Sequence, residues 1–159
     1  MERDQVAGLA AELRAQLRLL EQVHQRLNDR VVEGLETPAQ LDSVAYQIHN
    51  LYCAAEDLLK LVTQAFENRI GSSGEWHRIL LLRMSEPIPG IRPVLLSEDL
   101  FDVMNRLRGF RHFVRHAYVT DIDPTQLQAN LNLALKLAEA LPKAVQVFIA
   151  QLDTSEDSI

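Results

Sequence analysis

The sequence contains few residues that interrupt helices or cross-link chains. Its 159 residues include one cysteine, six glycines and six prolines, and aromatic residues make up 6%. The single Cys53 excludes an internal disulfide and a zinc cluster built on cysteines. No run approaches the ~20 apolar residues of a membrane span, and the charged segment "MERDQVAGLAAELRAQL" is unlike a secretory signal. These absences predict a cytoplasmic protein without a membrane association.

The apolar residues recur at helical spacing along most of the chain. A first amphipathic helix ends near Gly34, and a second runs from Pro38, capped by Thr37, to about Asn68. A short helix over "EWHRILLLRM" precedes a proline-rich loop. A fourth helix follows from Ser97 to about Val119, and a fifth from Asp123–Pro124 to about Leu152, where Pro142 should kink or divide it.

No segment alternates strictly enough to predict a strand. The pattern therefore predicts an all-α antiparallel bundle of four long helices and one short helix. We expect residues 1–152 to form one domain and residues 153–159 to form a polar, frayed tail.

Positive charge is concentrated in the fourth helix, although the chain as a whole is acidic. The chain has 16 Lys and Arg against 22 Asp and Glu, and four of the arginines lie between Asn105 and Tyr118, where there is no acid. The remaining twelve basic residues face all 22 acidic ones. Such an island is typical of an anion-binding site. A plain solvated basic face is the alternative, and the sequence alone favours the two equally.

Helical geometry divides this island into stripes. Leu107, Phe110 and Val114 fall on the core side, whereas Arg108, Arg111, Arg115 and Tyr118 form a neighbouring stripe, with His112 and His116 farther from the core. Like charges at three- and four-residue spacing repel one another, so an external anion or acids of another helix should neutralise them.

Arg111, His116 and Tyr118 spell R-x-x-x-x-H-x-Y, which resembles the motif of HEPN-superfamily ribonucleases, specifically the HepT-like toxins. The segments "YQIHNLYCAAEDLLKLV", "GEWHRILLLRM", "IRPVLLSEDL" and "LRGFRHFVRHAY" resemble successive blocks of that family over about residues 44 to 122. The terminal helices match it only in being helical. The resemblance implies a HEPN-like helical fold and a two-fold homodimer with the motif in a shared cleft.

The resemblance also implies metal-independent RNA cleavage, with no cofactor. His116 would help to deprotonate a ribose 2′-hydroxyl, and Arg111 would hold the phosphate. Arg108 and Arg115 would support RNA binding. His112, one turn before His116, is an alternative second histidine, although the family motif does not require it. The five histidines include no H-E-x-x-H pattern and predict no metal site.

Residues of the second helix are further candidates. Glu56 could pair with Arg111, as a polar residue of the central helix does in the family, or with Lys60 at i, i+4. We expect Tyr52 to be a core residue and Cys53 to be a buried structural thiol. Trp76 and His77 favour packing and capping roles over catalysis.

Tyr118 has two interpretations. It could simply end a helix with its hydroxyl in solvent. In HepT-like toxins, the motif tyrosine is modified with AMP by a partner nucleotidyltransferase antitoxin, which here would be a separate protein. Added phosphate beside Arg111 and His116 would block the cleft. A non-catalytic HEPN module that binds a nucleotide or a protein partner is the alternative function.

Overall fold

The computed structural model describes residues 1–67, 75–117 and 120–157, with side chains described as far as Thr154. Within these ranges, five helices follow one another: α1 (Arg3–Glu33), α2 (Pro38–Phe66), α3 (Trp76–Met84), α4 (Glu98–His116) and α5 (Pro124–Asp157). The described residues form no strand; the loop between α3 and α4 has one isolated bridge, between Ile88 and Arg92. The predicted all-α fold is confirmed.

The helix boundaries follow the predicted local signals. Thr37 Oγ1 accepts a hydrogen bond from the Gln40 backbone N–H at 3.2 Å, and Pro38 occupies the first turn of α2. Ser97 caps α4 in the same way, accepting from the Leu100 backbone N–H at 3.1 Å. Gly34 ends α1 with a φ of 121°, a conformation that L side chains rarely adopt. The chain can therefore turn sharply from α1 into α2.

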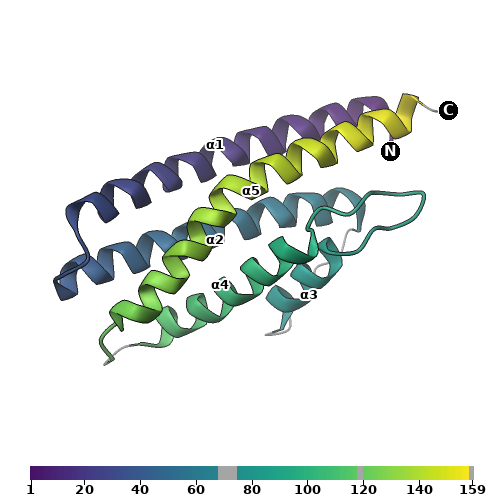
Figure 1. The fold of residues 1–159 in the computed structure, drawn as a ribbon. Coiled ribbons are helices and arrows are strands. Elements are labelled where there is room, and N and C mark those ends of the chain that lie inside the picture. The colour runs from purple at the N-terminus through teal and green to yellow at the C-terminus, as the bar shows by residue number, and fades with distance from the viewer. Residues whose placement is uncertain (68–74, 118–119, 158–159) are drawn as a thin grey trace.

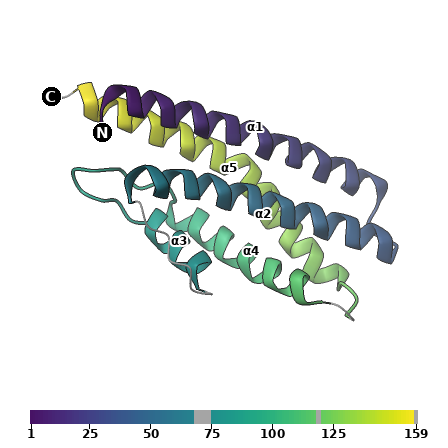
Figure 2. The ribbon, with the colours of Figure 1, turned by 180° about the vertical axis from the view of Figure 1, so that it is seen from behind.

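Helix α2 lies at the centre and contacts each of the other four helices. Figures 1 and 2 show α1 and α2 side by side, with α5 lying along α1 near the chain termini and reaching α4 at its other end. Leu51, Ala55, Leu58 and Val62 of α2 are completely buried and belong to one hydrophobic cluster with residues of the other helices. This position lets α2 present polar side chains to α3 and α4 at once.

Helix α5 differs in part from the prediction. Of the two predicted outcomes at Pro142, a kink or a division, the division does not occur, because Pro142 lies inside the helix. The ribbon changes direction along its length (Figures 1 and 2). The prediction of a frayed tail after Leu152 is wrong for residues 153–157, because α5 stays helical as far as Asp157. The segment "DTSED" contains no glycine or proline that would stop a helix. Thr154 Oγ1 also donates to the Ala150 carbonyl at 2.8 Å.

A buried arginine that we did not single out from the sequence fastens the loop before α4. Arg92 is 4% exposed, and its guanidinium forms an ion pair with Glu67 just past the end of α2. It also donates to the backbone carbonyls of Arg83 and Glu86, at 3.0 and 2.9 Å. These bonds join three segments: the end of α2, the end of α3 and the loop that leads into α4.

Within the described residues, no helix has the length and apolarity needed to cross a membrane.

Candidate active site

The basic island occupies the C-terminal half of α4. Phe110 is buried, whereas His112, Arg115 and His116 are exposed and Arg108 and Arg111 are half-buried. The predicted division of this helix into a core side and a polar side is therefore confirmed. Tyr118, the third residue of the motif, lies outside the described residues.

Arg111 is the most unusual member of the island. Its Nε is buried and has no hydrogen-bond partner among the described residues. An unsatisfied buried donor costs about 1–3 kcal/mol. The guanidinium lies beside α2, where its charge adds to the burial that lowers the pKa of His49 and opposes the burial that raises the pKa of Cys53. A hydrogen-bond acceptor at Nε would remove this penalty, and an anion could supply one.

The two histidines of α4 lie together on the solvent side. The ring centroids of His112 and His116 are 4.5 Å apart, with the ring planes at 55°. Both side chains are exposed, and histidine can donate or accept a proton near neutral pH. The sequence prediction that these residues face away from the core is confirmed. The pair supplies two acid–base groups on the same helix as Arg111.

Other arginines of the island have partners in the same helix. Arg106 Nε lies 3.7 Å from the Asp102 carboxylate, and Arg108 donates to the Asn105 side-chain oxygen at 3.0 and 3.2 Å. The helix therefore does supply one acid, contrary to the sequence interpretation. Arg111 and Arg115 have no ion pair within the described part of the chain. Arg108 likewise has no ion pair in that part of the chain, because Asn105 is uncharged, so positive charge without an ion pair is shared by Arg108, Arg111 and Arg115.

Glu56 does not have either of the predicted partners. It is 3% exposed, and its Oε2 accepts from Tyr52 Oη at 2.8 Å and lies 2.8 Å from His77 Nδ1. Lys60 instead pairs with Asp57 at 3.4 Å and lies 4.3 Å from the centroid of the Trp76 ring. Because His77 is at the start of α3, Glu56 fastens α3 to α2. We call Tyr52, Glu56 and His77 the α2–α3 seam.

Tyr52, Trp76 and His77, which surround Glu56, follow the sequence predictions more closely than Glu56 does. Tyr52 is 1% exposed, as expected of a core residue. The pKa of the Tyr52 hydroxyl is strongly raised. Burial is the largest cause, and the nearby charge of Glu56 is the second. Trp76 packs against the core and stacks on His77, with ring centroids 3.7 Å apart. The predicted packing role of Trp76 and His77 is thus confirmed. The predicted capping role is not, because Glu75 occupies the N-cap position of α3.

A second seam runs between α2 and α4 and contains a residue that sequence reasoning did not assign. His49 of α2 is half-buried, its Nδ1 has no partner among the described residues, and its Nε2 lies 3.7 Å from Cys53 Sγ. Burial, then Arg111 and Arg115, lowers the pKa of His49 below its usual 6.5, while Glu56 acts in the opposite direction. We call His49, Cys53, Arg111 and Arg115 the α2–α4 seam.

Cys53 is half-buried and reduced in this seam. Burial raises the pKa of its thiol, and Arg111 opposes the shift without cancelling it. The thiol is thus a poor nucleophile. The prediction that it is buried is only half met, because Cys53 is partly exposed. The spacing of His49 and Cys53, four residues apart on a helix, was the only sequence signal for their contact.

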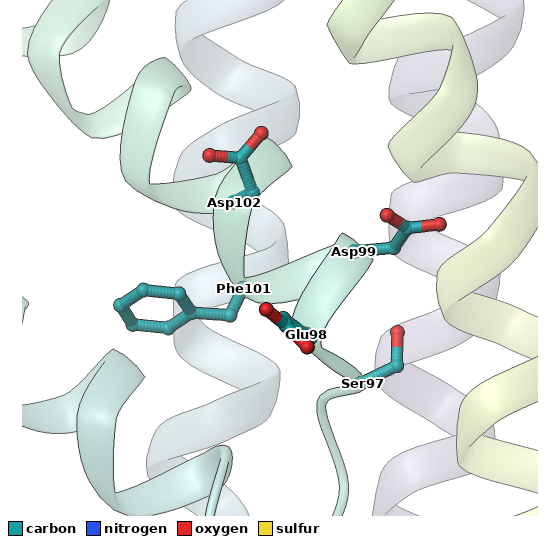
Figure 3. Close-up of a pocket in the computed structure, with 5 residues that line it drawn as sticks. All are labelled: Ser97, Glu98, Asp99, Phe101 and Asp102. Atoms are coloured by element: carbon teal, nitrogen blue, oxygen red, sulfur yellow. The ribbon is translucent and has the colours of Figure 1, made fainter.

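The opposite end of α4 has the opposite charge. A hollow of about 630 Å³ is lined by Ser97, Glu98, Asp99, Phe101 and Asp102. Figure 3 shows the three carboxylates spread around the first turns of the helix. Acids at a helix N-terminus stabilise the helix dipole but repel phosphate. This hollow is therefore not a candidate for binding a nucleic acid.

No group of three or more metal-binding side chains occurs among the described residues.

A comparison with known protein families identifies one match. A family model described as "HepT-like protein" matches residues 43–152, more than half of the chain. The match includes both seams, Arg111 and His116, and it extends through most of α5, beyond the segments in which we recognised the resemblance. No curated protein matches the chain with significant similarity.

Proposed function

The chain belongs to the HepT-like protein family, and from this premise we propose that it is a metal-independent endoribonuclease toxin. The observation that carries the proposal is the buried Nε of Arg111, which has no hydrogen-bond partner among the described residues and belongs to the same helix as the exposed His112–His116 pair. A cationic donor without a partner beside two acid–base groups is suited to phosphodiester chemistry.

In the proposed reaction, His116 takes the proton of a ribose 2′-hydroxyl. The 2′-oxygen then forms a bond to the adjacent phosphorus, and the bond from phosphorus to the 5′-oxygen of the next nucleotide breaks. A protonated acid, for which His112 is one candidate, gives its proton to that 5′-oxygen. The products are a 2′,3′-cyclic phosphate and a free 5′-hydroxyl.

Arg111 has an electrostatic role in this scheme. Its planar guanidinium keeps its charge at every working pH and offers several donors to the phosphate oxygens. Negative charge grows on those oxygens as the 2′-oxygen attacks, so a fixed cation favours the transition state over the bound substrate. Arg115, exposed and without an ion pair in the described part of the chain, adds a second positive charge for the RNA backbone.

We also propose a homodimer with the two α4 helices flanking one cleft. The exposed histidine pair and Arg115 support such a site, because a two-fold axis beside α4 would bring together the acid–base groups of both subunits. Light scattering or sedimentation tests this directly. A dilute monomer that still cleaves RNA would refute the composite cleft while leaving the nuclease assignment in place.

The proposed regulator is a separate nucleotidyltransferase antitoxin that transfers AMP to Tyr118. The motif places Tyr118 two residues after His116, so an attached phosphate would compete for the arginine donors. Mass spectrometry of the protein co-expressed with its neighbouring gene product should find AMP on Tyr118. Tyr118→Phe should retain part of the nuclease activity and resist neutralisation. AMP on another residue would contradict this mechanism.

The nuclease proposal is tested by incubating purified protein with RNA in EDTA and identifying the ends of the products. We expect cyclic phosphate and 5′-hydroxyl ends, and we expect His116→Ala to lose activity without unfolding. His24→Ala is the matched control, because His24 lies on α1 beside Glu21. Activity that EDTA abolishes would reject the chemistry. RNA binding without cleavage would favour a non-catalytic module.

A further inference from the structure

Two unpartnered nitrogens lie in the same seam. Three buried side-chain atoms have no hydrogen-bond partner within the described residues, namely Gln47 Oε1, His49 Nδ1 and Arg111 Nε. The two nitrogens belong to the α2–α4 seam and come from different helices. Buried polar groups of folded proteins nearly always have partners, so two exceptions in one place indicate that something outside the chain completes them.

The charges around these atoms favour an anion over water. Arg111 and Arg115 have no ion pair within the described part of the chain. Glu56, the nearest buried acid, already accepts from Tyr52 and lies 2.8 Å from His77. An oxyanion can accept from Arg Nε–H and from a histidine N–H together, and it gains charge-assisted bonds that water cannot supply.

We propose that His49 is a second ligand of the phosphate group in this site, acting with Arg111 from within the same subunit. The ligand class is a tetrahedral oxyanion, and the RNA phosphodiester is its source in the proposed function, on which this assignment of the source rests. His49 adds an anchoring residue from α2 to a site otherwise built from α4. The site would thus have a phosphate-binding pair in each subunit.

Binding through His49 should take up a proton. In the free protein, burial and the charges of Arg111 and Arg115 hold the pKa of His49 below 6.5, against the opposing effect of Glu56. The Cys53 thiol beside it is neutral, because its own pKa is raised. A bound anion offsets the two arginine charges and favours protonated His49. Anion affinity should therefore rise as the pH falls.

Calorimetric titration with sulfate and with a 2′-O-methyl RNA oligonucleotide tests this. Both probes keep their charge across the pH range, and the oligonucleotide cannot be cleaved because its nucleophile is blocked. Binding to the parent protein should be about tenfold tighter at about pH 5.5 than at about pH 8, from one additional charge-assisted bond. His49→Gln should lose most of this difference, and the matched control His24→Gln should keep it.

His112 and His116 are present in both the parent and His49→Gln, so the difference between these two proteins is the decisive quantity. Equal pH dependence in both proteins would overturn the proposal. If oligonucleotide binding shows no pH dependence while sulfate binding does, the assignment of the RNA phosphodiester as ligand is overturned.

A measurement on the parent protein covers the case in which His49→Gln does not fold. The ring resonances of His49 are titrated by NMR with and without saturating sulfate. A higher His49 pKa in sulfate is expected, and an unchanged pKa would overturn the proposal. This outcome is separable from the nuclease test: RNA cleavage with an unresponsive His49 rejects only the ligand role. A responsive His49 without RNA cleavage rejects only the proposed function.

Discussion

Helix α2 presents polar side chains to both of its smaller neighbours, and the two seams differ in one respect. In the α2–α3 seam, Glu56 has two partners, each at 2.8 Å. In the α2–α4 seam, His49 and Arg111 each keep a buried nitrogen without a partner in the described part of the chain. Satisfied buried groups hold elements together, whereas unsatisfied ones store a penalty that a ligand can remove.

The difference has opposite consequences for mutation. Removing a member of a satisfied network leaves its partner buried and unpaired, which destabilises the fold. Removing a group that is already unpaired takes away its own penalty, so the fold should tolerate the change. RNA cleavage should respond in the opposite way. Mutations in the unsatisfied seam should lower it more than mutations in the satisfied seam, because only the unsatisfied seam has donors left for the substrate.

Arg111→Ala should lower RNA cleavage about 10²- to 10³-fold, which is typical of losing one donor to developing negative charge. Its free energy of unfolding should stay close to that of the parent, since the mutation removes an unpartnered buried donor. Arg111→Lys should not restore activity, because an ammonium cannot reproduce the planar fork. Cleavage rates and urea denaturation provide the two measurements.

Arg106→Ala is the matched control for this prediction. Arg106 lies on the same helix but is exposed and paired with Asp102 at 3.7 Å. If both mutations lowered activity equally, the effect would come from overall positive charge, and Arg111 would lose its special role.

Glu56→Ala should destabilise the protein by about 2 kcal/mol, because Tyr52 and His77 would lose their shared acceptor. Cleavage should fall less than in Arg111→Ala at temperatures where the variant is folded. Glu56→Gln keeps one acceptor oxygen and should be less destabilising. A Glu56→Ala variant as stable as the parent but inactive would place Glu56 in the catalytic site and would erase the distinction between the two seams.

His49 should make stability depend on pH. Because its pKa is lower in the folded protein than its usual 6.5, the folded state binds fewer protons than the unfolded state. This contribution is fully present above about pH 6.5 and is lost as the pH falls through the lowered pKa. His49→Gln should show a shallower loss of stability in that range. A loss identical to that of the parent would assign the effect to other groups.

The sequence predicted what depends on nearby residues. Helix spacing located the five helices of the described residues, Thr37 and Pro38 marked the start of α2, and Ser97 marked the start of α4. A helix and its cap involve residues only a few positions apart. The stripe assignment of α4 was correct for the same reason.

Pairings between helices could not be predicted in this way. The Glu67–Arg92 ion pair and the Glu56–His77 contact join residues separated by 25 and 21 positions. Glu56 had several plausible partners, and only the packing of α3 against α2 selects His77. The role of His49 likewise depends on which face of α4 approaches α2.

If Arg111 binds a phosphate oxygen through Nε, the Nε–H resonance of Arg111 reports on this contact directly. NMR spectra of ¹⁵N-labelled protein should show this resonance, assigned by its absence in Arg111→Ala, during titration with a 2′-O-methyl RNA oligonucleotide. We predict a saturable shift of the Arg111 signal, accompanied by slower exchange of its proton with water, while the Arg106 signal stays in place. An Arg111 signal that remains unchanged when the oligonucleotide is fully bound would contradict the account.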